Sequence, residues 1–329
     1  MERNKSAVAL ERGYEEIRAR ISGAVVAFGE NSTTEKERRR QRALVDLRFF
    51  GETYFPHYLT APPSAMHKEM FDDFQSAVES GDALSKQALA APRGNAKSTV
   101  ASLLLPLWCI CSRRRKFIAI LSDTSEQANE FLEFIKAELE ANERLREDFP
   151  DVCGAGRTWK TGHIITANGV KVRCWGTGKS LRGARHGSHR PDRVICDDLE
   201  NDENAGSADQ RGKTENWFFK AAMKIGSRNT LYIVVGTILH YDSLLSKLLK
   251  RPGWSGKKYK SVIRFSTLPL WEEWERLYAQ RPETGDGRPE AAERFFEKNK
   301  SEMLSGVEVL WPEVEYYYYL IKMRVSDGP

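Results

Sequence analysis

The sequence QALAAPRGNAKST at residues 87–99 decides the fold that we expect for this chain. Residues 88–91 are small and apolar, as in a strand that is buried on both faces. Residues 92–96 break this pattern with proline, glycine and asparagine, and Lys97 opens an apolar helical stretch that runs to Trp108. The segment therefore predicts a buried strand, a tight loop and the start of a helix.

A loop of this kind can hold the phosphates of a nucleotide. Backbone N–H groups and the helix dipole attract phosphate, the lysine reaches the β and γ oxygens, and the next hydroxyl is a ligand of Mg²⁺. Ala91 and Ala96 replace the two glycines of the usual GxxxxGK pattern, so an ordinary strand–turn–helix remains an alternative. The residues expected to contact the nucleotide are Pro92, Arg93, Gly94, Asn95, Ala96, Lys97, Ser98 and Thr99. Ser98 is also the expected metal ligand.

The composition is that of a globular chain with one or two domains. It has 329 residues, of which 40% are hydrophobic and 29% charged. No apolar run approaches the length of a membrane span, and the charged N-terminus lacks the apolar core of a signal peptide. Five scattered cysteines indicate reduced thiols of an intracellular protein. The net charge of +5 permits a polyanionic partner without requiring one.

Strand-like and helix-like segments alternate after the loop. Residues 117–121 predict a second buried strand, and residues 126–145 an amphipathic helix. Such alternation builds a parallel sheet whose ligands lie beyond the carboxyl ends of the strands. Asn168-Gly169 between apolar residues predicts an inserted antiparallel hairpin. Residues 176–190, the basic loop, are rich in glycine and in basic residues, and we interpret them as a contact for DNA or phosphate rather than a plain linker.

A second strand end carries two adjacent carboxylates. Residues 194–196 are apolar, and Asp197 and Asp198 follow them directly. Adjacent acids are costly unless a cation or a proton-transfer role compensates them. In sheets that hydrolyse nucleotides, the first acid holds Mg²⁺ and a neighbouring carboxylate polarises the attacking water. Asp197 suits the metal, whereas Asp198 and Glu200 both remain candidates for the catalytic base.

Two further residues complete the expected site. Thr237 follows the apolar strand at residues 230–235, where a small polar side chain beside the acidic strand can sense the γ-phosphate. A mere turn is the alternative. His57 and His67 precede the strand at residues 88–91, and His67 is the candidate to lie over a bound base, against a purely structural role.

Three segments taken together resemble the ATPase domain of phage terminase large subunits, the DNA-packaging motors. They are APRGNAKST at residues 91–99, SLRGARHGSHRPDRVICDDLEND at 180–202 and TLYIVVGTILH at 230–240. That family tolerates alanine at the position of Ala96 and commonly carries an arginine early in the loop, as Arg93 does here. The resemblance extends from about residue 57 to about residue 312.

The resemblance implies an α/β fold of the P-loop NTPase class, ASCE type. We expect a mostly parallel central sheet flanked by helices, with an inserted β-hairpin and a small C-terminal lid subdomain. The expected domains are an N-terminal helical extension at 1–53, the ATPase core at 54–265, and the lid and linker at 266–329. Full-length relatives add an RNase H-like nuclease, but the last segment lacks the spaced carboxylates of a two-metal nuclease. Nuclease activity is therefore not expected from this chain.

The resemblance also implies an activity and its partners. The family hydrolyses ATP with Mg²⁺ to move double-stranded DNA into a procapsid, as a homo-oligomeric ring on the portal protein, with a small terminase subunit, in the host cytoplasm. By this resemblance Arg93 reaches toward the γ-phosphate and Thr237 couples hydrolysis to movement. A neighbouring subunit supplies an arginine to such sites, and Arg182 and Arg185 are the candidates. Another DNA-stimulated P-loop ATPase, such as a helicase, and an inactive nucleotide-binding module are the alternatives.

Overall fold

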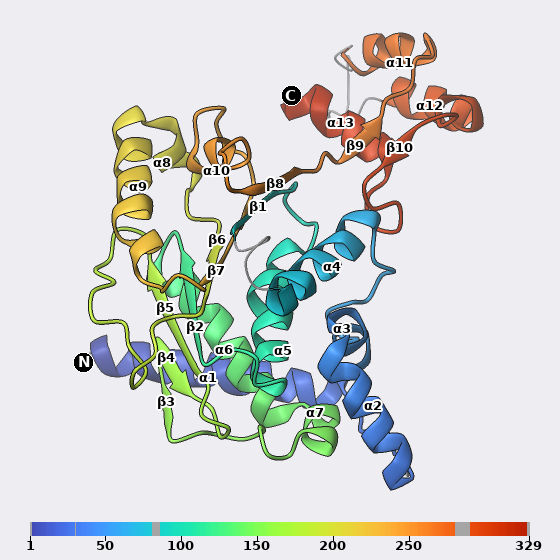
Figure 1. Cartoon of the computed structure of the whole chain (residues 1–329). Coiled ribbons are helices and arrows are strands. Elements are labelled where there is room, and N and C mark those ends of the chain that lie inside the picture. Colours follow the sequence, from blue (N-terminus) through green and yellow to red (C-terminus); the bar gives the residue numbers. More distant parts are fainter. Residues whose placement is uncertain (1, 30, 81–85, 280–289, 328–329) are drawn as a thin grey trace. The chain divides into compact units, whose positions relative to one another are not determined.

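The structure consists of two compact units (Figure 1). In this computed structural model, the described residues are 2–29, 31–80, 86–279 and 290–327. The sheet unit comprises Met1–Thr60 and His67–Lys258, and the C-terminal unit comprises Ala61–Met66 and Tyr259–Pro329. Within the described ranges, no helix is both long and apolar enough to cross a bilayer.

The sheet unit is built on eight strands in the order β3-β4-β5-β2-β6-β7-β1-β8. The strands from β5 to β8 in this order are parallel to one another, whereas β4 pairs antiparallel with both β5 and β3 at one edge. The strands are β1 (Lys86–Ala90), β2 (Phe117–Ser122), β3 (Thr158–Lys160), β4 (His163–Ile165), β5 (Lys171–Gly176), β6 (Arg193–Asp197), β7 (Leu231–Gly236) and β8 (Ser255–Lys258). The expected α/β class with a mostly parallel sheet and an inserted hairpin is confirmed.

Strand β7 lies between β1, which leads into the loop, and β6, which ends in the acids. Every residue of β2, β6 and β7 is buried, because these apolar strands are covered on both faces. The register pairs Ala90 with Gly236 and Asp197 with Val235. The carboxyl ends of β1, β6 and β7 therefore lie at one level, as expected of neighbouring parallel strands.

Helices cover both faces of the sheet, with α9 on one side and α4 and α5 on the other (Figure 1). They are α1 (Glu2–Ala24), α2 (Thr33–Val45), α3 (Leu47–Tyr54), α4 (Ala65–Ser80), η1 (Thr99–Leu104), α5 (Leu105–Cys111), α6 (Ser125–Ala141), α7 (Glu143–Asp148), α8 (Asp202–Gly206), α9 (Ala208–Lys220), η2 (Ala222–Lys224) and α10 (Leu244–Leu248). The helix predicted over residues 126–145 is divided in two. Asn142 is non-helical there, and its side chain caps α7 by accepting a hydrogen bond from Leu145 N.

The helix predicted from Lys97 to Trp108 has a wider first part than expected. Element η1 is a π-type helix, in which Leu105 N donates to the carbonyl of Val100, and a regular α-helix follows it. Pro106 has no N–H group, so it cannot form the ordinary helical bond to Ser102. The widening therefore has a local cause at the end of η1, and π-type turns are frequent at functional sites.

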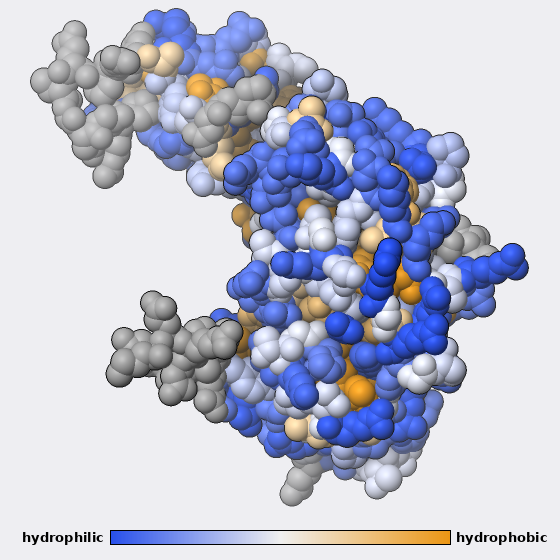
Figure 2. Space-filling view, turned by 90° about the vertical axis from the view of Figure 1, so that its left-hand side faces the viewer, coloured by the Kyte–Doolittle hydropathy of each residue, from blue (hydrophilic) through white to orange (hydrophobic). Residues whose placement is uncertain are grey.

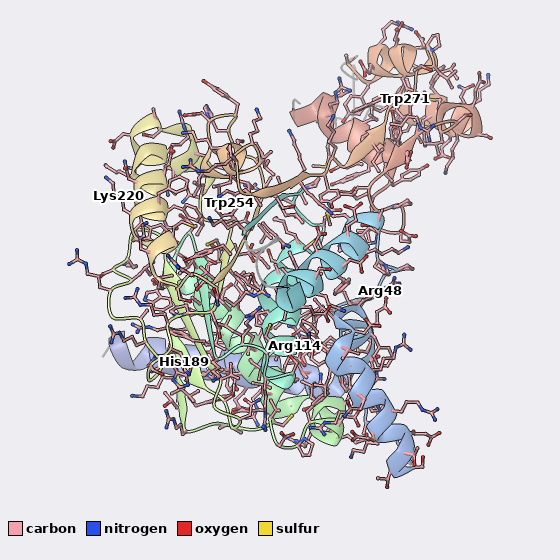
Figure 3. All side chains as sticks on the ribbon, in the orientation of Figure 1. Arg48, Arg114, His189, Lys220, Trp254 and Trp271 are labelled. Atoms are coloured by element: carbon pink, nitrogen blue, oxygen red, sulfur yellow. The ribbon has the colours of Figure 1, made fainter. Side chains whose placement is uncertain are left out.

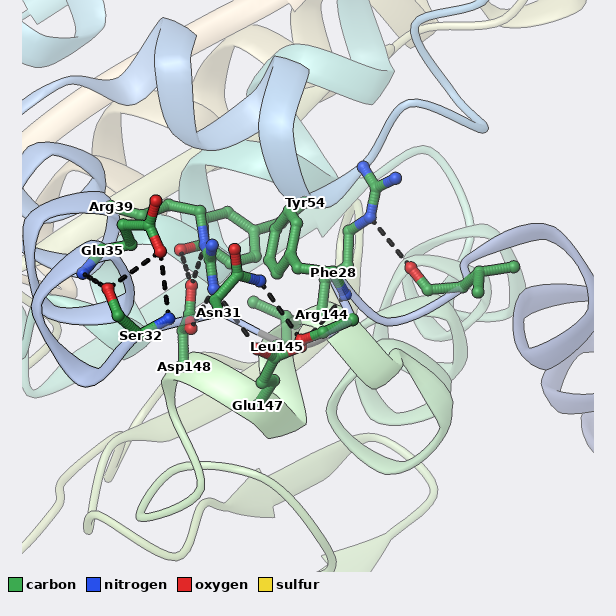
Figure 4. Close-up of polar contacts among 12 residues, drawn as sticks. Phe28, Asn31, Ser32, Glu35, Arg39, Tyr54, Arg144, Leu145, Glu147 and Asp148 are labelled. Atoms are coloured by element: carbon green, nitrogen blue, oxygen red, sulfur yellow. Dashed lines mark hydrogen bonds and ion pairs between the residues drawn. The ribbon is translucent and has the colours of Figure 1, made fainter.

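Buried polar contacts hold the N-terminal helices α2 and α3 against α7 (Figure 4). Arg39 donates two hydrogen bonds to Asp148, at 2.6 and 2.7 Å, and Tyr54 donates a third at 2.6 Å. The Asp148 side chain is fully buried. Phe28 N donates to the carboxylate of Glu147, and the Arg39 guanidinium lies 3.6 Å from the Phe28 ring centre. The helical N-terminal segment thus packs as part of the sheet unit.

The C-terminal unit has its own aromatic core. It contains an antiparallel pair, β9 (Val262–Arg264) with β10 (Glu308–Val309), and the helices α11 (Leu270–Tyr278), α12 (Glu290–Met303) and α13 (Tyr317–Asp327). The rings of Phe296 and Tyr318 stack at 3.8 Å, and Trp271 and Trp274 pack edge to face beside them. Because this core is separate from that of the sheet, the unit can be treated as a small domain.

Candidate nucleotide site

Two residues of the loop after β1 have left-handed backbone conformations. Gly94 has a φ of 79° and Ala96 a φ of 48°, so both are left-handed. Only glycine adopts this region without strain, and an alanine in it costs roughly 1–2 kcal/mol. Ala96 therefore adopts the left-handed conformation that suits a glycine at this position. The replacement of the second glycine of the GxxxxGK pattern by alanine thus does not change the backbone conformation there.

Lys97, Asp198 and Thr237 meet beyond the ends of β1, β6 and β7. The buried Lys97 Nζ lies 3.6 Å from Asp198 Oδ2 and donates to Thr237 Oγ1 at 3.2 Å. Thr237 N donates to Asp198 Oδ1 at 3.1 Å. Asp198 is itself left-handed, with a φ of 45°, and strain of this kind tends to occur at functional sites. Residues from three distant segments thus form one polar cluster.

Ser98 and Asp197 lie together beneath this cluster. Ser98 Oγ donates to Asp197 Oδ1 at 2.9 Å, and Ser102 Oγ donates to Asp197 Oδ2 at 2.6 Å. Burial raises the pKa of Asp197 to about 6, although the two hydroxyl donors partly offset this effect. A partly desolvated carboxylate has much to gain from a cation, so Asp197 is placed where a positive charge would stabilise it.

This donor set fits Mg²⁺ held together with phosphates. Over the residues described, no group of three or more His, Cys, Asp or Glu side chains could hold a metal alone. Mg²⁺ in nucleotide sites is held by one or two protein groups, waters and phosphate oxygens rather than by a protein cage. The hydroxyl of Ser98 beside the carboxylate of Asp197 supplies the protein part of such a set.

The structure gives the two candidate bases different surroundings. Glu200 Oε1 accepts a hydrogen bond from Leu244 N at 3.0 Å, at the start of α10, and burial raises its pKa. Asp198 instead contacts Lys97 and Thr237. A cavity of about 10 Å³, near the space that one water needs, is lined by both Asp198 and Glu200, together with residues of β7 and α10, so the cavity itself does not separate the two acids. The geometry favours Asp198 as the group facing the reaction.

Arg93 and His67 differ from their expected placement. The exposed Arg93 side chain forms an ion pair with Asp202 Oδ2 at 2.7 Å, and this partner raises its pKa. His67 is only 2% exposed, and its Nε2 lies 2.9 Å from the carbonyl of Asn95. Burial lowers the His67 pKa, so the ring is neutral and donates to that carbonyl. His67 supports the loop from inside, which argues against stacking on a base. His57 contacts Glu138 instead.

Arg182 and Arg185 lie in a separate cavity of about 710 Å³, the basic groove, between the basic loop and α9. Among the described residues that line it, six are cationic and none is a carboxylate; the cations are Lys179, Arg182, Arg185, Arg190, Lys220 and Lys224. Lys220 and His189 lie on the same side of the unit (Figure 3), and Figure 2 shows the hydrophilic character of that face. The structure does not bring either arginine to the small cavity beside Asp198.

Sequence reasoning missed several residues that hold the site. Ser102 binds Asp197, and its position four residues after Ser98 in an otherwise apolar helix could have indicated a shared face. Asp123 N donates to the carbonyl of Asp198, and Thr177 contacts the carbonyl of Leu199. No local pattern marks these two residues, because their partners lie far along the chain.

No protein-family model matches this sequence, and no curated protein matches it. Among solved structures, it is similar to the large terminase ATPase domain of Thermus phage P74-26, crystallised as an arginine-to-alanine variant. The two are 13% identical, the match covers 68% of this chain and 90% of that chain, and the TM-score is 0.43. At this distance the match is a resemblance only, and the case for a function rests on the geometry of the site.

Proposed function

We propose that the sheet unit binds and hydrolyses ATP with Mg²⁺. One observation carries the proposal. Side chains that the sequence separates by about a hundred positions or more converge at the ends of three adjacent strands, and the distances there are 2.9 to 3.6 Å. They comprise a lysine, a hydroxyl paired with a buried carboxylate, and a second carboxylate. Binding of a nucleoside triphosphate with Mg²⁺ requires these groups close together.

Each residue has a distinct role in this proposal. Lys97 neutralises charge on the phosphates, and the backbone N–H groups of residues 93–96, where Gly94 and Ala96 are left-handed, are offered to them. Ser98 and Asp197 would hold Mg²⁺, which when bound neutralises charge on the phosphate oxygens. Asp198 accepts the proton of the attacking water as its oxygen bonds to the γ-phosphorus and ADP departs. Thr237, bonded to both Lys97 and Asp198, senses the change when the γ-phosphate is lost.

The decisive experiment compares ATP turnover in three proteins. Lys97→Ala removes the charge at the site and is expected to abolish turnover. Lys116→Ala is the matched control. Lys116 is exposed and directly precedes β2, so it lies at the amino ends of the parallel strands, opposite the proposed site. This variant is expected to behave as the wild type. Equal rates in the wild type and in Lys97→Ala would overturn the proposal and support an inactive binding module.

We further propose that this ATPase is the motor domain of a viral terminase large subunit. The three sequence segments that resemble that family support this, and so does the basic groove, whose charge suits the phosphates of double-stranded DNA. The motor would act as a homo-oligomeric ring on a portal protein, with a small terminase subunit, in the host cytoplasm. A helicase-like ATPase is the alternative, and an assay of strand separation against packaging into procapsids distinguishes the two.

The groove arginines have two possible partners within this proposal. If they bind DNA, Arg182→Gln and Arg185→Gln flatten the salt dependence of DNA binding, because each phosphate contact releases counterions. If they act on a neighbouring subunit's nucleotide, a ring mixed from these variants and Lys97→Ala subunits regains turnover. Arg93, released from Asp202, is the further candidate to reach a γ-phosphate. If the variants change neither the salt dependence of DNA binding nor the turnover of mixed rings, the basic loop is a plain linker.

A further inference from the structure

The basic loop makes an unusual connection between two parallel strands. It leaves β5 and enters β6 on the far side of β2, a crossover that a helix usually makes. In the described structure of residues 177–192, the only regular pairing is an isolated bridge between His186 and His189. The buried Leu181 and Ala184 anchor the loop to the sheet, so its cationic side chains face outward into the basic groove.

The first residues of this loop are rigidly held. A side chain at Gly176 would place its Cβ 2.6 Å from Ser125 N, so only glycine fits against the start of α6. Thr177 N donates to the carbonyl of Ser122 at 2.8 Å. Thr177 Oγ1 lies 3.1 Å from that carbonyl and 3.2 Å from the carbonyl of Leu199. One hydroxyl has one proton, so it donates to one of these two carbonyls at a time.

The segment that Thr177 contacts carries the proposed base. Leu199 directly follows Asp198, whose left-handed backbone needs support from its surroundings. Asp123 N donates to the carbonyl of Asp198 at 3.1 Å, and Asn201 donates to the Asp123 carboxylate at 2.8 Å. Residues 198–201 are therefore held from the end of β2 and from the root of the basic loop.

Two residues after Thr177, the chain reaches the basic groove. Lys179 lines the groove, and its carbonyl accepts a hydrogen bond from Trp217 Nε1 on α9 at 2.9 Å. A polyanion that engages Lys179 and Arg182 acts on the chain immediately after Thr177. The path from groove to Asp198 thus consists of adjacent residues and one side-chain hydroxyl, with two alternative acceptors.

We propose that Thr177 is a positioning residue that couples occupancy of the basic groove by double-stranded DNA to the orientation of Asp198. This inference rests on the proposed function. DNA phosphates in the groove fix the chain at Lys179, and the Thr177 hydroxyl then donates to Leu199 rather than to Ser122. The Leu199 carbonyl in turn fixes the peptide that carries Asp198. DNA stimulation of ATP hydrolysis therefore passes through the hydroxyl.

The test measures kcat and KM for ATP with and without a short linear double-stranded DNA. Thr177→Val keeps the shape of the side chain and removes the hydroxyl, whereas Thr177→Ser keeps the hydroxyl. Couplings of this kind amount to roughly 2- to 30-fold in rate, so Thr177→Val is expected to lower the DNA-stimulated kcat by about that factor. The KM for ATP and the Kd for DNA are expected to stay at the wild-type values, and Thr177→Ser to retain stimulation.

Three results would overturn the inference. They are full stimulation in Thr177→Val, an equal loss in Thr177→Val and Thr177→Ser, and a wild-type ATPase that DNA does not stimulate. Each leaves the proposed ATPase intact as long as Lys97→Ala abolishes turnover. Failure of the proposed function has a different signature, since Lys97→Ala then matches the wild type. Thermal denaturation of both Thr177 variants confirms that they remain folded.

Discussion

Ala96 and Asp198 hold backbone conformations that strain residues other than glycine, with φ values of 48° and 45°. Both lie where a nucleotide would be bound, one in the loop after β1 and one after β6. The tertiary structure stabilises each of them. Val100 N donates to the carbonyl of Ala96, and the Asp198 backbone bonds to Val235 in β7 and to Asp123 just after β2. Strain at these two residues therefore marks the site independently of the side-chain cluster.

Ala96→Gly tests this strain. The substitution removes the Cβ from a left-handed residue, so the free energy of unfolding is expected to rise by about 0.5–1 kcal/mol, while ATP turnover is kept. Ala91→Gly is the matched control. Ala91 has no positive φ, so glycine there only increases the freedom of the unfolded chain and is expected to lower stability by about 0.5–1 kcal/mol. Urea denaturation of the wild type and the two variants measures both changes in the free energy of unfolding. The same change in Ala96→Gly and Ala91→Gly would refute the claim that Ala96 is strained.

The assignment of Asp198 rather than Glu200 as the catalytic base can be tested by substitution. Asp198→Asn is expected to lower kcat by about 10²–10⁴-fold, the usual contribution of a positioned general base. Glu200→Gln keeps an oxygen that can accept the hydrogen bond from Leu244 N, so its kcat is expected to stay close to that of the wild type. Steady-state kinetics distinguish them, and the reverse pattern would assign the base to Glu200.

His67 predicts a pH dependence of stability. Burial holds its pKa below the ordinary value of about 6.5, so the unfolded chain takes up a proton there that the folded chain does not. This contribution to stability is therefore present above about pH 6.5 and is lost as the pH falls toward the folded pKa. His67→Gln removes the titrating group. We expect the wild type to be more stable than this variant at neutral pH and the difference to narrow on acidification, as measured by thermal melts. A constant difference would contradict this prediction.

At the scale of elements, α7 provides the anchor for the N-terminal helices. Asp148 accepts three hydrogen bonds from Arg39 and Tyr54 in a fully buried position. Removal of one partner from a buried pair leaves an uncompensated charge. These contacts join segments that lie about a hundred positions apart, so they stabilise the fold rather than any one helix.

Asp148→Ala is expected to lower the free energy of unfolding by about 3 kcal/mol, because it removes three hydrogen bonds to a buried carboxylate and leaves Arg39 only its 3.5 Å ion pair with Glu147. Glu52→Ala is the control on the same group of helices. Its ion pair with Arg48 is 2.8 Å long, but both side chains are about two-fifths exposed, so its loss is expected to cost less than about 1 kcal/mol. Chemical denaturation compares the two, and equal effects would show that burial does not decide the strength of the pair.

At the scale of the whole molecule, two separate cores predict two unfolding transitions. The sheet unit contains the proposed nucleotide site, whereas the aromatic core of the C-terminal unit contains none of the residues proposed for it. A ligand that binds only the folded state raises stability by about 2.7 kcal/mol at a hundredfold excess over Kd. ATP with Mg²⁺ is therefore expected to raise only the transition of the sheet unit.

Phe296→Ala identifies the second transition. Phe296 is fully buried and stacks on Tyr318, and its truncation is expected to cost about 3–5 kcal/mol within the C-terminal unit alone. Scanning calorimetry with and without nucleotide follows both transitions. A single transition that shifts as a whole with nucleotide and with Phe296→Ala would show that the two units unfold cooperatively.

The sequence by itself determined the α/β class, the parallel strands at residues 88–91, 117–121 and 194–196, and the hairpin turn. Apolar runs, turn residues and the charges at strand ends are local properties, so they can be read along the chain. The order of these elements also predicts that the loop lysine and the paired acids lie at one edge, because parallel strands end there together.

Only the tertiary structure decided which side chains touch. Glu200 is hydrogen-bonded to the start of α10, whereas Asp198 lies beside Lys97. His67 contacts the loop from its buried side, and Thr177 contacts the carbonyl of Leu199. The predicted helix is interrupted at Asn142. The Lys97–Thr237 contact alone joins positions 140 residues apart. The physical reason is that hydrogen bonds and ion pairs act over a few ångströms in space, whereas sequence patterns report only what a residue's near neighbours along the chain require.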